Sequence, residues 1–178
     1  GAEPLAEILG YASTCDAYHR VQPAPDSAES ARAITMALAH AGVAPDDLDY
    51  INLHGTSTQL NDVLETRALH LALGESARTL GMSATKSMIG HPQGASGAAG
   101  IAATILPMRA GFLHPTINLR DSGEGDAACD LDYIAEGARP LPQRARDTQR
   151  GGLALCNCIA FGSKNSALVL RVNHPRVA

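Results

Sequence analysis

The stretch LDYINLHGTST, from Leu48 to Thr58, decides the fold. Its first six residues, 48–53, form a short apolar run of the kind that builds a buried strand. A polar segment, HGTST, follows directly at His54. In α/β sheets, functional side chains gather in the loops beyond the carboxyl ends of the strands. The stretch therefore predicts a buried strand that delivers a histidine to such a loop.

Strands and helices are expected to alternate on both sides of this stretch. Upstream, we expect a strand over 5–12, a loop over 13–25 and a helix over 27–41, with Asp26 as its N-cap and Gly42 as its stop. Downstream, we expect a helix over 63–73, a strand over 80–84, a helix over 94–108, a strand over 112–117, an irregular segment over 118–151, and a hairpin of strands 152–159 and 166–172. This order predicts one α/β domain with a sheet of mixed direction, flanked by helices.

The composition excludes several classes of protein. The 178 residues carry 14 Lys+Arg against 18 Asp+Glu, a net charge of −4. No basic cluster accompanies it, which argues against a nucleic-acid partner. The hydrophobic content of 45% is too high for disorder, yet no uninterrupted run of about 18 apolar residues predicts a membrane span. Only 18% of the residues are charged, below the roughly 25% of an average domain, so we expect part of the surface to be covered.

Cysteine usage indicates a reducing compartment. The four cysteines form no C-x-x-C motif and have no regular spacing, which argues against a disulfide framework. They are Cys15, Cys129, Cys156 and Cys158. The chain also opens without a signal-peptide pattern and without Met, which indicates a processed or truncated start. We therefore expect reduced thiols and a cytoplasmic location.

Three loops carry the residues that could perform chemistry: 54–58, 85–100 and 156–165. A single strand-end histidine is as often bonded to the backbone as it is functional, and this applies to His54 and to His91. Lys86 stands among small residues, where a lysine must be paired or must shift its pKa; the alternative is a lysine at an exposed loop tip.

Taken together, these groups favour one kind of chemistry. Two imidazole N–H groups aimed at one point can hold the oxygen of an enolate, and a nearby ammonium supports them. A metal site of His54, His91 and Asp62 is the weaker alternative, because zinc sites usually show a tight histidine pair or a C-x-x-C motif. The glycines of the second loop match no nucleotide-binding pattern, which favours close backbone packing there.

Four motifs occur in a characteristic order: HGTST at 54–58 with Asp62 and Glu65 downstream, TKSMIGHPQGASG at 85–97, PTINL at 115–119, and CNCIAFGSKN at 156–165. Together they resemble the carboxyl-terminal half of a β-ketoacyl-acyl carrier protein synthase, a condensing enzyme. The resemblance runs from about Ala6 to Val172. It implies a thiolase-like fold, in which residues 1–178 form the C-terminal αβα half of a five-layer αβαβα architecture.

The resemblance also implies roles for single residues. His54 and His91 would jointly stabilise the enolate that forms when a malonyl thioester loses carbon dioxide. Lys86 would support this pocket electrostatically. Phe161 would act as a gate that shields the nucleophile and admits the extender unit.

The same resemblance implies the substrate contacts and the partners. Thr56 and Thr58 would hydrogen-bond the phosphopantetheine arm of an acyl carrier protein, so that no further cofactor or metal is expected. Asp16 and His19 would belong to a second mobile loop beside the phenylalanine. The other partners would be the N-terminal half of the same ketosynthase and a second ketosynthase subunit in a dimer.

The nucleophilic cysteine of the family belongs to that N-terminal half, and no segment of this chain matches it. Cys156 and Cys158 align with a serine-bearing segment, and we interpret them as small core residues. Cys15 and Cys129 are expected to be inert.

Two departures from the family pattern matter. Gly100 replaces a glutamate that pairs with the lysine and helps to bind a structural cation, a site to which Asn52 and Asn157 would also belong. Ser163 replaces a glycine in the gating segment, which is expected to stiffen it.

Other functions stay open at this point. A non-catalytic subunit resembling a chain-length factor is the main alternative, although such subunits dispense with the catalytic residues present here. A degradative thiolase is a third possibility, but its motifs are absent. The sequence leaves fatty-acid, polyene and other polyketide pathways open.

Overall fold

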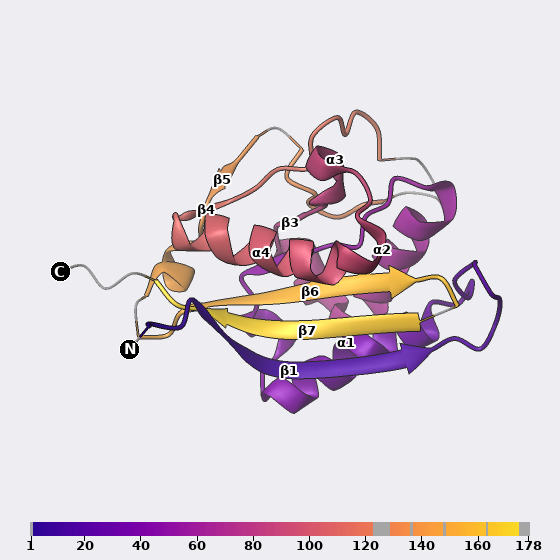
Figure 1. The fold of residues 1–178 in the computed structure, drawn as a ribbon, viewed down its shortest axis with the longest axis horizontal. Coiled ribbons are helices and arrows are strands. Elements are labelled where there is room, and N and C mark those ends of the chain that lie inside the picture. Colours follow the sequence, from indigo (N-terminus) through magenta and orange to yellow (C-terminus); the bar gives the residue numbers. More distant parts are fainter. Residues whose placement is uncertain (1, 123–128, 136, 148, 163, 175–178) are drawn as a thin grey trace.

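The chain folds around a five-stranded mixed sheet with helices on both faces (Figure 1). The structure is a computed structural model, and it describes residues 2–122, 129–135, 137–147, 149–162 and 164–174. The strand order is β1-β7-β6-β2-β3. The bounds are Ala6–Cys15 for β1, Tyr50–Asn52 for β2, Met82–Ser83 for β3, Gly152–Ala160 for β6 and Lys164–Val172 for β7.

The sheet has an antiparallel half and a parallel half. β6 and β7 form the expected hairpin, and β1 pairs with β7 in the antiparallel sense, from Ala6 opposite Val172 to Cys15 opposite Lys164. β2 lies between β6 and β3 and is parallel to both. The predicted mixed direction of the sheet is therefore confirmed, and the carboxyl ends of β2, β3 and β6 point to the same edge.

Two long helices cover one face of the sheet. α1, Ala28–Ala41, packs on β1 and β7, and α2, Gln59–Leu73, packs beside α1. The approach is closest at Gly10 of β1, where a Cβ atom would lie 2.3 Å from the carbonyl oxygen of Ala37. The main apolar core fills the space between these helices and the sheet.

The other face is only half covered. α4, Ser96–Arg109, packs mainly on β6 and encloses a second apolar cluster around Tyr50 and Met108. β1 and β7 lie beside it with no helix drawn over them in Figure 1. On this open side Ile8 is 64% exposed and Tyr11 is 51% exposed.

Short elements complete the fold. They are α3 (Lys86–Ile89), β4 (Phe112–Leu113), β5 (Arg139–Pro140), and the 3-10 turns Pro45–Asp47, Gly74–Thr79, Gln93–Ala95 and Gln143–Arg146. The described residues contain no helix of the length and apolar character that crossing a bilayer requires.

A buried carboxylate fastens one of these turns to the sheet. The Asp49 side chain is fully buried and accepts hydrogen bonds from Arg144 Nε at 2.7 Å and Arg150 at 2.6 Å. It also accepts the backbone N–H of Leu153 at 2.9 Å. This clamp holds the segment before β6 against the start of β2, at the end of the sheet away from the histidines.

Some predicted helix boundaries were wrong, and local capping explains that of α2. α1 begins after Ser27 rather than after Asp26, although Asp26 Oδ1 accepts the N–H of Ala28. α2 begins at Gln59, four residues earlier than predicted, because the Thr58 side chain accepts the N–H of Asn61 and caps the helix.

Strand pairing accounts for the wrong strand boundaries. β1 extends to Cys15, into the first part of the predicted loop, because β7 supplies backbone hydrogen-bond partners up to that residue. The predicted strand 112–117 is only β4, Phe112–Leu113, which pairs with β5 inside the segment predicted to be irregular.

Candidate active site

His54 and Lys86 meet because their strands are parallel neighbours. His54 is the second residue after β2, and Lys86 is the first residue of α3, which follows β3. Lys86 Nζ lies 3.3 Å from His54 Nδ1 and donates a hydrogen bond to the carbonyl oxygen of His54. His54 is only 5% exposed, so the lysine reaches a buried imidazole.

His91 brings a second imidazole to the same place. Its ring centroid lies 5.6 Å from that of His54, and the two ring planes meet at 82°. The backbone N–H of Gln93 donates to His91 Nδ1 at 2.9 Å. The structure thus brings together the three residues that the sequence singled out for enolate chemistry.

The hydrogen bonds define which nitrogen of each imidazole carries the proton. An ammonium and a backbone N–H can only donate, so Nδ1 is the acceptor in both His54 and His91. In a neutral imidazole the other nitrogen then carries the hydrogen. Both histidines therefore offer an Nε2–H donor.

Burial keeps His54 neutral. Desolvation, together with the positive charge of Lys86 and the proximity of His91, lowers the pKa of His54 to about 3. Burial also lowers the pKa of Lys86. A neutral His54 keeps its Nε2–H donor form over the whole physiological pH range.

Glu65 fixes the backbone that carries His54. Its buried carboxylate accepts the backbone N–H groups of His54 and Gly55, each at 2.8 Å. The amide groups of Asn157, at 2.7 Å, and Asn61, at 3.4 Å, donate to the same carboxylate. Burial raises the pKa of Glu65, while the donated hydrogen bonds oppose that shift. The sequence included Glu65 in a motif but assigned it no role; the structure makes it the link between α2, β6 and the His54 loop.

The two threonines of the HGTST loop lie toward solvent, at the part of the loop that leads into α2. Thr56 Oγ1 and Thr58 Oγ1 are 3.0 Å apart, and Thr58 also caps α2. Their predicted contact with a phosphopantetheine arm remains a prediction.

The turn that carries Phe161 is joined to the loop after β1. Phe161 is 79% exposed at the tip of the β6–β7 hairpin. The next residue, Gly162, donates its N–H to the carbonyl oxygen of Arg20 at 2.7 Å. Ser163 lies outside the described residues.

Asp16 and His19 shape that loop from within. Asp16 accepts the N–H of Ala24 at 2.8 Å and the side-chain amide of Asn165 at 2.6 Å. The backbone nitrogens of Val21 and Gln22 each lie 3.1 Å from His19 Nδ1, toward which their N–H groups point. The two predicted loops are therefore side by side, and their gating role remains a prediction.

The residues around Gly100 lack the carboxylate of the structural cation site that the family pattern implies. Gly100 brings no carboxylate, and a Cβ atom there would lie 2.9 Å from Asn52 Oδ1. The side-chain nitrogen of Asn52 donates to Thr85 at 2.8 Å and that of Asn157 donates to Glu65, whereas Asn157 Oδ1 is buried and has no hydrogen-bond partner among the described residues. Among the described residues, no three His, Cys, Asp or Glu side chains are grouped to hold a metal ion, so the sequence-based metal alternative has no support there.

Sequence reasoning missed a buried histidine beneath the site. His114 is 3% exposed and lies 3.1 Å from the carbonyl oxygen of Pro115, to which its Nδ1 donates. Its Nε2 is then the acceptor, and three possible donors surround it: Tyr50 Oη at 3.0 Å, Asn52 Nδ2 at 3.2 Å and Thr85 Oγ1 at 3.2 Å. Burial lowers the pKa of His114. Its only signal in the sequence was a polar residue inside an expected apolar strand.

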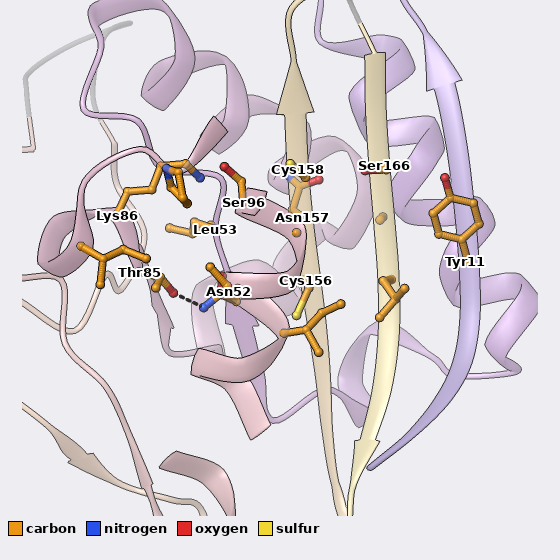
Figure 2. A pocket seen from close by; sticks show the side chains of 18 residues that line it. Tyr11, Asn52, Leu53, Thr85, Lys86, Ser96, Cys156, Asn157, Cys158 and Ser166 are labelled. Carbon is orange, nitrogen blue, oxygen red and sulfur yellow. Dashed lines mark hydrogen bonds between the residues drawn. The ribbon is translucent and has the colours of Figure 1, made fainter. Parts of the chain in front are cut away.

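The two cysteines of β6 have different surroundings. Cys156 hydrogen-bonds Thr104 of α4 at 3.3 Å, and burial raises the pKa of its thiol to about 11. Cys158 is half-buried, and its Sγ lies 3.6 Å from His54 Nδ1. Both line a cavity of about 160 Å³ that Lys86 also enters (Figure 2). The interpretation as core residues suits Cys156, whereas Cys158 belongs to the site.

A mixed α/β sheet with helices on both faces, carrying His54, Lys86 and His91 in the loops at the carboxyl ends of its parallel strands, defines a thiolase-like domain. Comparison with known proteins identifies the family: residues 5–120 match the β-ketoacyl synthase C-terminal domain. The chain belongs to this family.

Individual proteins that are similar to this chain belong to the same family. The chain is 43% identical over 171 residues to 3-oxoacyl-[acyl-carrier-protein] synthase 2 of Synechocystis sp., covering 96% of this chain and 38% of the relative. Among solved structures, it resembles the ketosynthase of a complex between a type II PKS acyl-carrier protein and its ketosynthase bound to the hexaketide, with 36% identity and a TM-score of 0.85. It also resembles the ishigamide ketosynthase/chain length factor, with 35% identity and a TM-score of 0.83. Each structural match covers 96% of this chain and 39% of the other. The chain thus spans less than two fifths of these relatives.

Proposed function

We propose that this chain supplies the enolate-stabilising half of a β-ketoacyl-acyl carrier protein synthase, which joins a malonyl unit to an acyl thioester by decarboxylative Claisen condensation. One observation carries the proposal: His54 and His91 each accept a hydrogen bond at Nδ1, so both have an Nε2–H to offer at rings 5.6 Å apart. Two such donors can both hydrogen-bond one thioester oxygen.

In this mechanism the malonyl carboxylate leaves as carbon dioxide, and the electron pair of the broken C–C bond moves into the thioester. Negative charge then develops on the thioester oxygen. The Nε2–H groups of His54 and His91 stabilise it, since donors fixed in advance in a buried site are most effective where charge develops. Lys86 holds Nδ1 of His54 and thereby keeps that donor in place.

The enolate carbon then attacks the carbonyl of the second substrate, an acyl group held as a thioester on a cysteine. A new C–C bond forms, and the cysteine thiolate leaves with the electron pair of the broken C–S bond. That cysteine belongs to the N-terminal half of the family pattern, so we expect this chain to act in one site with that half. The exposed side chains of Ile8, Tyr11 and Leu106, on the half-covered face, support such packing.

The loops suggest how substrates enter. We expect Thr56 and Thr58, near the rim of the HGTST loop, to hydrogen-bond the phosphopantetheine arm of an acyl carrier protein. We expect Phe161 to gate the nucleophile, in step with the loop of Asp16 and His19. The hydrogen bond between Gly162 and Arg20 supports this coupling.

The decisive experiment measures carbon dioxide release from malonyl-acyl carrier protein by the chain combined with the nucleophile-bearing half. His54→Ala and His91→Ala should each lower the decarboxylation rate by about 10²–10³-fold, the loss typical for one oxyanion donor. His40→Ala, at an exposed position of α1, is the matched control and should keep the activity. A loss below tenfold in both site variants would overturn the proposal. Condensation by the isolated chain would overturn the split site.

A subunit resembling a chain-length factor remains the second candidate, favoured by Gly100, which offers Lys86 no carboxylate. This candidate predicts no decarboxylation by the combined halves, with either wild-type or variant chain. The same assay therefore separates the two functions.

A further inference from the structure

Two side chains converge on the inner nitrogen of His54. Lys86 Nζ lies 3.3 Å from Nδ1 and comes from α3, while Cys158 Sγ lies 3.6 Å from the same atom and comes from β6. Figure 2 shows Lys86 and Cys158 on opposite sides of the cavity that both line. The imidazole thus has a possible donor from each of two independent elements.

The chemistry of an imidazole makes these two donors alternatives. A neutral imidazole has one lone pair, on the nitrogen without hydrogen. A thiol can donate to it weakly and an ammonium more strongly. Lys86 has a second acceptor, because it also donates to the carbonyl oxygen of His54. Whichever group donates to Nδ1, the hydrogen of His54 stays on Nε2.

Cys156 provides an internal contrast. It lies two residues earlier on the same face of β6 and lines the same cavity (Figure 2). Its hydrogen-bond partner, however, is Thr104 of α4. Contact with His54 therefore depends on position 158 and is not a general property of the thiols on this strand.

We propose that Cys158 is a positioning residue that shares with Lys86 the hydrogen bond to His54 Nδ1, so that His54 keeps its Nε2–H donor when Lys86 does not supply that bond. The inference rests on the proposed function only in assigning the Nε2–H group of His54 to the oxygen of the thioester enolate. The arrangement of the hydrogen bonds themselves can be tested without any activity.

The first test reads the tautomer of His54 by nitrogen NMR on histidine-labelled protein near pH 7. Lys86→Met should leave Nδ1 unprotonated, because Cys158 still donates. Lys86→Met combined with Cys158→Ala should give a mixture of tautomers, and Lys86→Met with Cys158→Ser should restore the single form. Lys86→Met with Cys156→Ala is the matched control and should behave like Lys86→Met alone.

Two results would overturn the proposal: a mixture of tautomers already in Lys86→Met, or a single tautomer in the Cys158→Ala double variant. The resonances of the remaining histidines report whether each variant is folded. If Cys158→Ala disturbs them, Cys158→Val repeats the removal of the donor with a side chain of similar bulk.

The second test is a double-mutant cycle on decarboxylation by the combined halves. Residues that substitute for one another show non-additive losses. We expect the double variant to lose about tenfold more activity than the product of the two single losses, and losses that simply multiply would contradict the proposal. If no form decarboxylates malonyl-acyl carrier protein, the proposed function fails, while the tautomer measurement still decides the role of Cys158.

Discussion

The neutral state of His54 should make the stability of this fold depend on pH. His54 is 5% exposed, and burial lowers its pKa to about 3 in the folded chain. In the unfolded chain a histidine has a pKa of about 6.5. As the pH falls below 6.5, the unfolded state therefore takes up a proton that the folded state refuses, and stability decreases until the pH approaches 3.

The size of this effect follows from the two pKa values. At pH 5 the unfolded histidine is about 97% protonated, whereas His54 in the folded chain is about 1% protonated. Integrated from pH 7 to pH 5, this difference lowers the free energy of unfolding by about 2 kcal/mol.

Urea denaturation at pH 7 and pH 5 tests this reasoning. His54→Gln removes the titrating group, so the loss of stability between the two pH values should shrink by about 2 kcal/mol relative to the wild type. His40→Gln, on the exposed side of α1, is the control and should keep the wild-type difference. The reasoning is refuted if His54→Gln keeps that difference too, or if the NMR signal of His54 titrates with a midpoint above pH 5.

Three further changes test the packing by urea denaturation. Asp49→Ala should lower the free energy of unfolding by about 3 kcal/mol, because it leaves the buried N–H of Leu153 without its partner and two arginines without their carboxylate; a loss below 1 kcal/mol would contradict the clamp. Gly10→Ala should cost about 2 kcal/mol, since its Cβ would lie 2.3 Å from the Ala37 oxygen, and an unchanged midpoint would argue against that close approach. Gly97→Ala, in α4 with nothing within 4 Å of its Cβ, should instead gain about 0.5–1 kcal/mol, and a loss there would show that the helix is constrained in another way.

The parts of the fold that could be predicted are those with a strong local signal. α1 has apolar residues at helical spacing and ends at Gly42, which adopts the left-handed conformation. The parallel strands β2 and β3 could be predicted from short apolar runs. Because such strands end at one edge, the meeting of His54 and Lys86 could be predicted as well.

The remaining features depend on contacts that are distant in the sequence. Ser13 and Thr14 look like loop residues, yet their hydroxyls donate to the carbonyl oxygens of Asn165 and Glu29 while β7 pairs with their backbone. Burial of His114 requires partners from β2 (Tyr50 and Asn52), from Ser83 of β3 and from the segment after β3, and no spacing rule indicates them. The position of Cys158 beside His54 follows only from the order of strands β6 and β2.

The neighbourhood of β1 and β7 has a consequence for how the chain is made. Within this sheet β1 is synthesised before the other strands, and its partner β7 is synthesised after them, with Asn173 donating to the carbonyl oxygen of Leu5 just beyond the paired region. Until β7 has been synthesised, β1 can bury its apolar side only against α1. Pairs so far apart in sequence form slowly. A ribosome that stalls before β7 would therefore release a chain in which β1 presents an open edge, a ready target for chaperones or for another strand.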